Sequence, residues 1–487
     1  MRQLLKYWDL ITLFFFIIIY SLTFSWLAIL RHEAFASSYD LANMGQTVWN
    51  TLYGHFFSFT GTQGTVSRLS VHADFLLILF APLYLIWNNI RVLLIAQSVG
   101  LALGALPTYF LAKSILGSSQ VLGKNTIKIV SLIIAAVYLL NPNMEWTNSY
   151  DFHAVAFAIP LFLAAFYFAH TKKWWLFALF ALLTLLTKEE LGLDLAMLGL
   201  YIAVIVRQKR IGMVTFLIGM IWTFAMIFVV IPGAAKTGTH WAFAWYSLDD
   251  TTPVALNLPE KINDYVIKTI STGTLGYFNQ LIHPFAYLPL LGLPFLFLSL
   301  PEILINILSD HGQMQSTMFH YDSAITPAII IATIYAYFVI LFLLKHFKIT
   351  IKIRQFIILG VAVCSFIYVL RVNYHQSPLP ITPSCWCLVY QVSADDVAFN
   401  KLLQQLPKNA TITSSPEVRA HVTRREYSYT LPSAIDTADY VALIDQNRIV
   451  GDYSPKTFEN ELIPRLQTDS RHILVSHLGH FWLFKKI

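Results

Sequence analysis

Charged residues are scarce in this sequence. Asp, Glu, Lys and Arg make up 12% of its 487 residues, whereas a soluble domain carries about 25%. Hydrophobic residues make up 56%, and the mean hydropathy of +0.59 indicates a chain dominated by apolar segments. This balance excludes an ordinary water-soluble protein, and we expect most of the chain to lie in lipid.

Several other signals are also missing. The three cysteines, Cys364, Cys385 and Cys387, show no metal-ligand spacing, and a disulfide between the last two would close a very tight ring. No internal repeat or low-complexity segment stands out. The net charge is +6, but the Lys and Arg residues lie in short clusters between apolar segments. Such clusters indicate membrane topology, so we expect no nucleic-acid partner.

The sequence does contain many apolar stretches long enough to cross the hydrocarbon core of a bilayer, which is roughly 30 Å thick. They recur from residue 8 to residue 371 and predict about 10–12 membrane segments. The first stretch, 8–30, follows a short basic start but is too long for a typical signal peptide and lacks a small-residue cleavage site. We interpret it as a retained anchor.

The basic clusters predict the side on which each loop lies. The positive-inside rule places these clusters in the cytoplasm, so the loops 31–90 and 233–282 are expected outside. Between the first external loop and the basic cluster that begins at Lys113, the chain can cross the membrane only once. We therefore predict that 91–112 crosses and that 71–87 is a juxtamembrane or re-entrant helix. The segment 283–309 is interrupted by four prolines, and we interpret it as a broken hairpin.

After the last apolar segment, the composition becomes that of an ordinary globular domain. The runs "ATITSS", "YVALID" and "HILVSH" are typical of buried strands, with polar helical stretches between them. The sequence therefore predicts a multi-pass α-helical membrane domain over 1–371 and a small soluble α/β domain over 372–487. The alternation of segments places the second domain on the extracytoplasmic side.

Ionisable residues in or beside membrane segments are costly, which makes them candidates for function. In the expected topology, five separate segments offer such groups to one cavity in the outer leaflet: Asp40, His72, Asp74, Asp151, His153, Lys188, Glu189, Glu190, His320 and Tyr321. We expect Asp40, Asp151 and His153 to form the catalytic group and the other seven to bind substrate. Among the aromatic residues, only Trp49 and Trp146 are expected close to this site.

Asp40 lies in the first external loop, where a carboxylate could act as general base toward an acceptor hydroxyl. The alternative is a helix N-cap, because Asp40 precedes an apparent helix. Asp151 and His153 supply ligand types that suit a divalent cation such as Mg²⁺ or Mn²⁺, and so do His72 and Asp74. A hydrogen-bonded polar network that packs the loops together is the alternative for both pairs.

Two further segments have two interpretations each. Lys188 lies beside Glu189 and Glu190 at the outer end of a helix, where it could meet a lipid-linked phosphate or form a structural ion pair. His320 and Tyr321 open another helix, and they could line the same cavity or form a satisfied interfacial pair.

Several motifs in the chain carry a family resemblance: "YDLANMGQTVWNTLYGHFFSFT", "HADFLLILFAPLYLI", "LLNPNMEWTNSYDFH", "TKEELGL", "FHYDSAITP" and the tail "LPKNATITSSPEVRAHVTRREYSYTLP". They resemble a family of bacterial and archaeal membrane proteins known as domain of unknown function 2079. The resemblance covers nearly the whole chain, although the family name states no activity.

The order of parts is more distantly similar to that of C-type glycosyltransferases, which take a sugar from a polyprenyl-phosphate carrier. In those enzymes an acidic residue of the first external loop is the catalytic base, and Asp40 is the position here that fits. His72 falls where several of them carry a His- or Lys-containing motif before a juxtamembrane helix. This sequence has no Asp-x-Asp or Glu-x-Asp in its first loop and no Pro-Pro after His72, so Asp40 is expected as an analogue of that base.

The resemblance implies an inner-membrane glycosyltransferase that moves a hexosyl or pentosyl group from a polyprenyl-phosphate donor to an extracytoplasmic acceptor. The polar cavity agrees with this, because a leaving phosphate needs cationic or metal groups to neutralise it. Two alternatives stay open. A transporter or flippase would use the same buried charges as a substrate path, and a non-catalytic scaffold would bind an envelope partner through 372–487.

Overall fold

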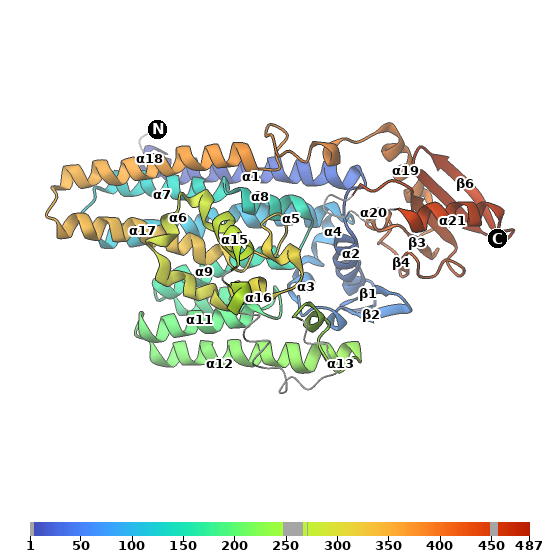
Figure 1. Cartoon of the computed structure of the whole chain (residues 1–487), viewed down its shortest axis with the longest axis horizontal. Helices are drawn as coiled ribbons and strands as arrows, with labels where there is room; N and C mark the ends of the chain where they lie inside the picture. The colour runs from blue at the N-terminus through green and yellow to red at the C-terminus, as the bar shows by residue number, and fades with distance from the viewer. Residues whose placement is uncertain (1–3, 247–265, 270, 449–455) are drawn as a thin grey trace.

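The computed structural model describes residues 4–246, 266–269, 271–448 and 456–487. An elongated bundle of helices makes up most of it, and a smaller domain of helices and strands lies at one end of the bundle (Figure 1). The bundle runs up to α18 (Ile351–Gln376), and the smaller domain contains β3 to β7. The predicted fold class, a multi-pass helical protein with a small C-terminal α/β domain, is confirmed.

Within the described residues, five helices are long and apolar enough to cross a membrane. They are α1 (Trp8–Glu33), α5 (Arg91–Leu103) with α6 (Ala105–Ser118), α12 (Lys209–Ala225) continuing to α13 (Ile231–Ala235), α17 (Thr326–His346), and α18. A further candidate span bends by 42° between α7 (Lys124–Leu139) and α8 (Pro142–Tyr150). Shorter helices pack between them: α9 (Ala158–His170), α10 (Trp174–Leu185), α11 (Leu191–Val204) and α16 (Leu300–Leu308).

The long helices expose apolar side chains, as helices do in lipid. On α12, for example, Leu217 and Ile221 are exposed, while small residues such as Gly219 are buried. These small residues let α11 and α12 approach closely, because a Cβ atom added to Gly192 would lie 2.3 Å from the backbone oxygen of Gly219. The pair therefore combines a lipid-compatible surface with a glycine contact that leaves no room for a side chain.

The first loop folds onto the end of the bundle. It contains α2 (Tyr39–Leu52), the hairpin of β1 (Ser58–Gly61) and β2 (Gly64–Ser67), and then α3 (Leu76–Phe80) and α4 (Leu83–Ile86). The stretch predicted as a juxtamembrane or re-entrant helix thus forms two short helices, which together are too short to cross a core of roughly 30 Å.

The proline-rich stretch follows α15 (Thr272–Ile282) and forms three 3-10 segments, His283–Phe285, Leu288–Leu290 and Leu293–Ser299, before α16. Proline lacks the N–H that a continuous α-helix needs, which explains the short segments. Gly292 packs directly on α17, since an added Cβ would lie 2.0 Å from the backbone oxygen of Ala332. The path of the proline-rich stretch 283–309 relative to the membrane stays a prediction.

The C-terminal domain is built on a five-stranded sheet with the order β4-β3-β5-β7-β6. Its elements are α19 (Ala394–Gln405), β3 (Ile412–Ser414), α20 (Pro416–Arg419), β4 (Ser428–Thr430), β5 (Tyr440–Ile444), α21 (Thr457–Thr468), β6 (His472–Leu478) and β7 (Phe481–Lys486). β3 runs parallel to β4 and β5, and β7 is antiparallel to β5 and β6. The three predicted strand motifs correspond to β3, β5 and β6. Cys385 and Cys387 form a disulfide, which the sequence had left open.

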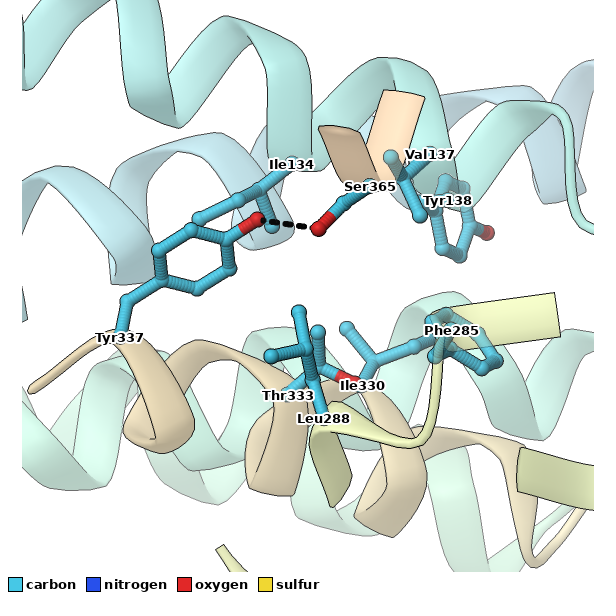
Figure 2. A pocket seen from close by; sticks show the side chains of 9 residues that line it. All are labelled: Ile134, Val137, Tyr138, Phe285, Leu288, Ile330, Thr333, Tyr337 and Ser365. Atoms are coloured by element: carbon cyan, nitrogen blue, oxygen red, sulfur yellow. Dashed lines mark hydrogen bonds between the residues drawn. The ribbon is translucent and has the colours of Figure 1, made fainter. Parts of the chain in front are cut away.

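A small void lies inside the bundle between α7, α17 and α18 (Figure 2). Mostly apolar side chains line it, and the Tyr337 hydroxyl donates a hydrogen bond of 3.1 Å to Ser365 Oγ across its edge. Its volume is about 10 Å³, which is room for about one water molecule. This void is too small for a substrate.

Candidate functional site

A polar cavity of about 500 Å³ lies where the bundle meets the C-terminal domain. Its walls come from α2, the segment before α3, the end of α8, the α10–α11 loop, the 3-10 helix Trp241–Tyr246, and the loop before α17. Six of the ten predicted site residues line this cavity: Asp40, His72, His153, Lys188, His320 and Tyr321. Segments far apart in the sequence thus bring their polar groups to one place.

Asp40 stands in the first turn of α2 with its carboxylate on the cavity wall. The N-cap of α2 is Ser38, whose hydroxyl accepts a hydrogen bond from Asp40 N–H, so the Asp40 carboxylate is not the cap. Its Oδ2 lies 3.6 Å from His153 Nε2. Burial raises the pKa of Asp40, but His153, Arg68 and His72 outweigh this effect and hold the pKa below its ordinary value. Asp40 is therefore ionised at neutral pH.

Aromatic rings form the wall beside Asp40. The His153 ring stacks on His320 with centroids 3.8 Å apart, and Tyr150 stacks on His153 at 5.6 Å. Burial and the proximity of His153 hold the pKa of His320 well below its ordinary value, so His320 is neutral. Tyr321 packs against His320 at 4.3 Å and also faces the cavity.

Asp151 does not reach the cavity. It is buried, with Oδ1 3.2 Å from Arg31 Nη1 and Oδ2 accepting a hydrogen bond of 2.6 Å from Ser38 N–H. Gln97 fixes the same turn, because its amide donates to the Asp151 carbonyl and accepts from His153 N–H. Asp151 therefore anchors the start of α2 and positions Asp40 rather than facing a substrate.

The side chains expected to bind a divalent cation are not arranged to bind one. Both Asp151 oxygens face other partners, and His153 Nε2 faces Asp40 instead of Asp151. His72 and Asp74 likewise point to different partners, Glu189 and Arg68. Across the described ranges, no group of three or more His, Cys, Asp or Glu side chains is arranged to hold a metal ion.

Asp74 forms a buried two-point ion pair with Arg68. Arg68 Nε lies 3.0 Å from Oδ1 and Nη2 lies 2.6 Å from Oδ2. Arg68 also lines the cavity, although sequence reasoning missed it. The signal was available, since Arg68 precedes Asp74 by six residues in the polar part of the first loop.

His72 and Lys188 lie on the wall that the cavity shares with a second chamber of about 260 Å³. This chamber is mostly apolar, with Ile227, Phe243 and Ile305 in its walls, and the two cavities also share Trp241, Trp245 and Tyr321. Polar and apolar spaces therefore meet at His72 and Lys188.

Each of these two residues has a carboxylate partner. Glu189 also lines the second chamber, with its Oε1 2.8 Å from His72 Nδ1. Glu190 lines the second chamber and lies 2.5 Å from Lys188 Nζ. Burial lowers the pKa of Lys188, but Glu190 and Glu189 outweigh it and raise the pKa, so Lys188 keeps its charge.

The expectation that Trp49 and Trp146 are the only aromatic residues close to the site is wrong, because Trp241 and Trp245 line the cavity. Trp49 stacks on Tyr53, and Trp146 packs edge-on against Trp386, so neither lines the cavity. Besides Tyr150, the aromatic walls come from the loop 233–282 and the loop before α17: Trp241, Trp245, His311 and Phe319. The C-terminal domain adds Pro416.

Comparisons with known proteins agree with this architecture. The sequence profile of a family described as "Predicted membrane protein (DUF2079)" matches residues 31–476. No curated protein matches the sequence. Among solved structures, ArnT from Cupriavidus metallidurans, bound to undecaprenyl phosphate, superposes with a TM-score of 0.51 at 12% identity and 97% coverage of both chains.

A second similar structure is the Archaeoglobus fulgidus oligosaccharyltransferase tethered with an acceptor peptide. Its TM-score is 0.42 at 13% identity, with 90% of this chain and 65% of that chain covered. The likeness to ArnT concerns the whole length of both chains and shows a shared fold. The chain therefore belongs to the DUF2079 family of membrane proteins and shares the fold of ArnT.

Proposed function

We propose that this protein is a membrane glycosyltransferase that moves a sugar from a polyprenyl-phosphate donor to an extracytoplasmic acceptor. The observation that carries the proposal is the Asp40 carboxylate, 3.6 Å from His153 Nε2, on the wall of a polar cavity that adjoins a mostly apolar chamber. The shared fold with ArnT, whose structure contains undecaprenyl phosphate, supports this donor class.

The two adjoining cavities suit the two parts of such a donor. A polyprenyl chain needs an apolar path, and the chamber lined by Ile227, Phe243 and Ile305 offers one. The sugar and the acceptor need polar and aromatic walls, which the cavity around Asp40 offers. The phosphate then falls at the shared wall, beside His72 and Lys188.

In the proposed reaction, the acceptor hydroxyl oxygen attacks C1 of the sugar. The C1–O bond to the phosphate breaks, and its electron pair leaves with the phosphate oxygen. Asp40 accepts the proton of the hydroxyl. The donor phosphodiester carries one negative charge, and the released phosphate monoester carries up to two. Cationic groups at the shared wall therefore stabilise the transition state more than the bound donor.

We further propose that the protein lies in the inner membrane and that the loops 31–90 and 233–282 and the domain 372–487 are extracytoplasmic. The basic clusters between the apolar segments support this orientation. It would place Asp40 at the outer leaflet, where a lipid-linked sugar meets an envelope acceptor.

The test is an activity screen with purified protein in lipid bilayers. A panel of polyprenyl-phosphate sugars is supplied with candidate acceptors, and release of polyprenyl phosphate is measured for the wild-type protein and for Asp40→Asn. Release by the wild-type protein that is lost in the variant supports the proposal. Folded wild-type protein that releases no phosphate from any donor would count against it and favour a transporter or a scaffold.

A further inference from the structure

Glu189 is held rigidly behind His72. Its Oε1 lies 2.8 Å from His72 Nδ1, and its Oε2 accepts a hydrogen bond of 3.0 Å from Ala73 N–H. Trp241 fixes the same segment from the other side, because its Nε1–H donates to the Val71 carbonyl at 2.8 Å. Glu189 is 3% exposed, whereas the His72 side chain is 21% exposed. Among the residues that the structure describes, the second ring nitrogen of His72 has no hydrogen-bond partner, and His72 lines both cavities.

The carboxylate decides which nitrogen of His72 carries a proton. An ionised carboxylate only accepts hydrogen bonds, so Nδ1 must carry a proton to satisfy the contact. When Nε2 is also protonated, the ring is an imidazolium with one N–H on Glu189 and the other available for the cavity. Glu189 is ionised: burial raises its pKa, but His72, His240 and Lys188 outweigh burial and hold the pKa well below its ordinary range.

We propose that Glu189 is a positioning residue that holds His72 as the imidazolium which binds the phosphate of the polyprenyl carrier. The inference rests on the proposed function in taking a polyprenyl phosphate as the ligand. It assigns Glu189 a role through His72 instead of direct contact with substrate, and it explains why the carboxylate also clamps the backbone at Ala73.

Other charged and titratable groups surround this pair. They are Arg68 and Asp74 from the first loop, Asp40 on α2, Lys188 beside Glu189, His240 at 3.8 Å from Glu189, and His320 from the loop before α17. Arg68 is engaged by Asp74 and Lys188 by Glu190. Glu189 likewise touches only one of the two ring nitrogens of His72.

Changing Glu189 to Gln isolates this role. The Gln oxygen would accept from Ala73 N–H as one Glu oxygen does now, which leaves its NH₂ group facing His72 Nδ1. Nδ1 must then accept the bond, so the ring becomes neutral with its proton on Nε2. The loop clamp is preserved and the negative charge is lost, which also removes a charged neighbour of Lys188 and His240. The matched control is Glu145→Gln in α8, because Glu145 is also buried but does not line either cavity.

Two measurements test the proposal in the full-length protein in nanodiscs. The first is the affinity for undecaprenyl phosphate between about pH 6 and pH 9, across the range where an imidazolium loses its proton. For the wild-type protein and Glu145→Gln, the affinity should fall on the alkaline side. For Glu189→Gln and for His72→Asn, it should be about tenfold weaker at neutral pH and should lack this fall. The double variant should be no weaker than either single variant.

The second measurement is turnover with a polyprenyl-phosphate sugar. Glu189→Gln should lower kcat by about 10- to 100-fold with a smaller change in donor KM, since the phosphate gains charge in the transition state. An unchanged pH dependence of binding in Glu189→Gln, or additive effects in the double variant, would overturn the proposal. If the wild-type protein shows the predicted binding but no turnover with any donor, the proposed transferase activity fails while the phosphate site stands.

Discussion

Arg419 joins the C-terminal domain to the helix that carries Asp40. Its guanidinium lies in α20 of the C-terminal domain and is 3% exposed. Across the interface, Nη1 donates to Asn43 Oδ1 at 2.6 Å, and Nη2 donates to Gln46 Oε1 at 3.3 Å and to the Thr60 carbonyl at 2.9 Å. Asn43 and Gln46 belong to α2, so Arg419 fixes the helix from the side of the C-terminal domain.

Replacing Arg419 with Met keeps much of the side-chain volume and removes all three contacts. Hydrogen bonds from a charged donor contribute about 1.5–3 kcal/mol each, but they are not additive within one network. Each buried acceptor left without its donor costs about 1–3 kcal/mol. A cost of about 3 kcal/mol at this interface corresponds to a rise of about 100-fold in the population with α2 released. We expect kcat to fall as well, because α2 positions Asp40.

Hydrogen exchange of the backbone amides in α2 measures this release directly. The matched control is Arg425→Met, since Arg425 is also buried but donates only within its own domain, to the Val422, Pro407 and Ala410 carbonyls. Arg419→Met should speed exchange in α2, whereas Arg425→Met should affect only the C-terminal domain. Equal exchange rates for α2 in the two variants would refute the reasoning.

Three further outcomes follow from the structure. The pKa of Asp40 lies below the ordinary value of about 4, so Asp40 loses its charge only at a pH below about 4. The pH profile of kcat/KM should therefore show no acid limb from Asp40 above about pH 4, and an Asp40-dependent limb near neutral pH would contradict this. Gly192→Ala places a methyl group 2.3 Å from a backbone oxygen of α12 and should destabilise the protein by about 1–3 kcal/mol in thermal unfolding, whereas Gly360→Ala, with nothing within 4 Å, should not. A cysteine at the exposed Lys408 should react with a membrane-impermeant reagent added to intact cells, and reaction only after lysis would reverse the proposed orientation.

The fold and the meeting of the polar motifs were predictable because both depend on strong local signals. Apolar length identifies the five helices of the described residues that are long enough to cross a membrane, while the other predicted segments form shorter helices. The three strand motifs form strands as predicted, although β6 is mostly exposed and not buried. The positions of Asp40, His153 and His320 on one cavity follow from segment order and charge alternation. These patterns are read along the chain and need no knowledge of side-chain partners.

Partner choice could not be predicted in the same way. Asp151 and Asp74 share the carboxylate chemistry of Asp40, yet each is engaged by a buried arginine, Arg31 or Arg68. The contact between Arg419 and α2 joins residues more than 370 positions apart, and nothing in the local sequence marks it. The difference between a base, an anchor and an ion pair arises only when the chain is folded.

The measurement that tests the central claim most directly is the steady-state kinetics of Asp40→Asn against the wild-type protein with one donor that turns over. Asp395→Asn, at an exposed position on α19, serves as the control. Loss of a general base predicts that Asp40→Asn lowers kcat by about 100- to 10,000-fold with little change in donor KM, and that the control keeps full activity. A variant that keeps more than about a tenth of the wild-type kcat would contradict the assignment of Asp40 as the base.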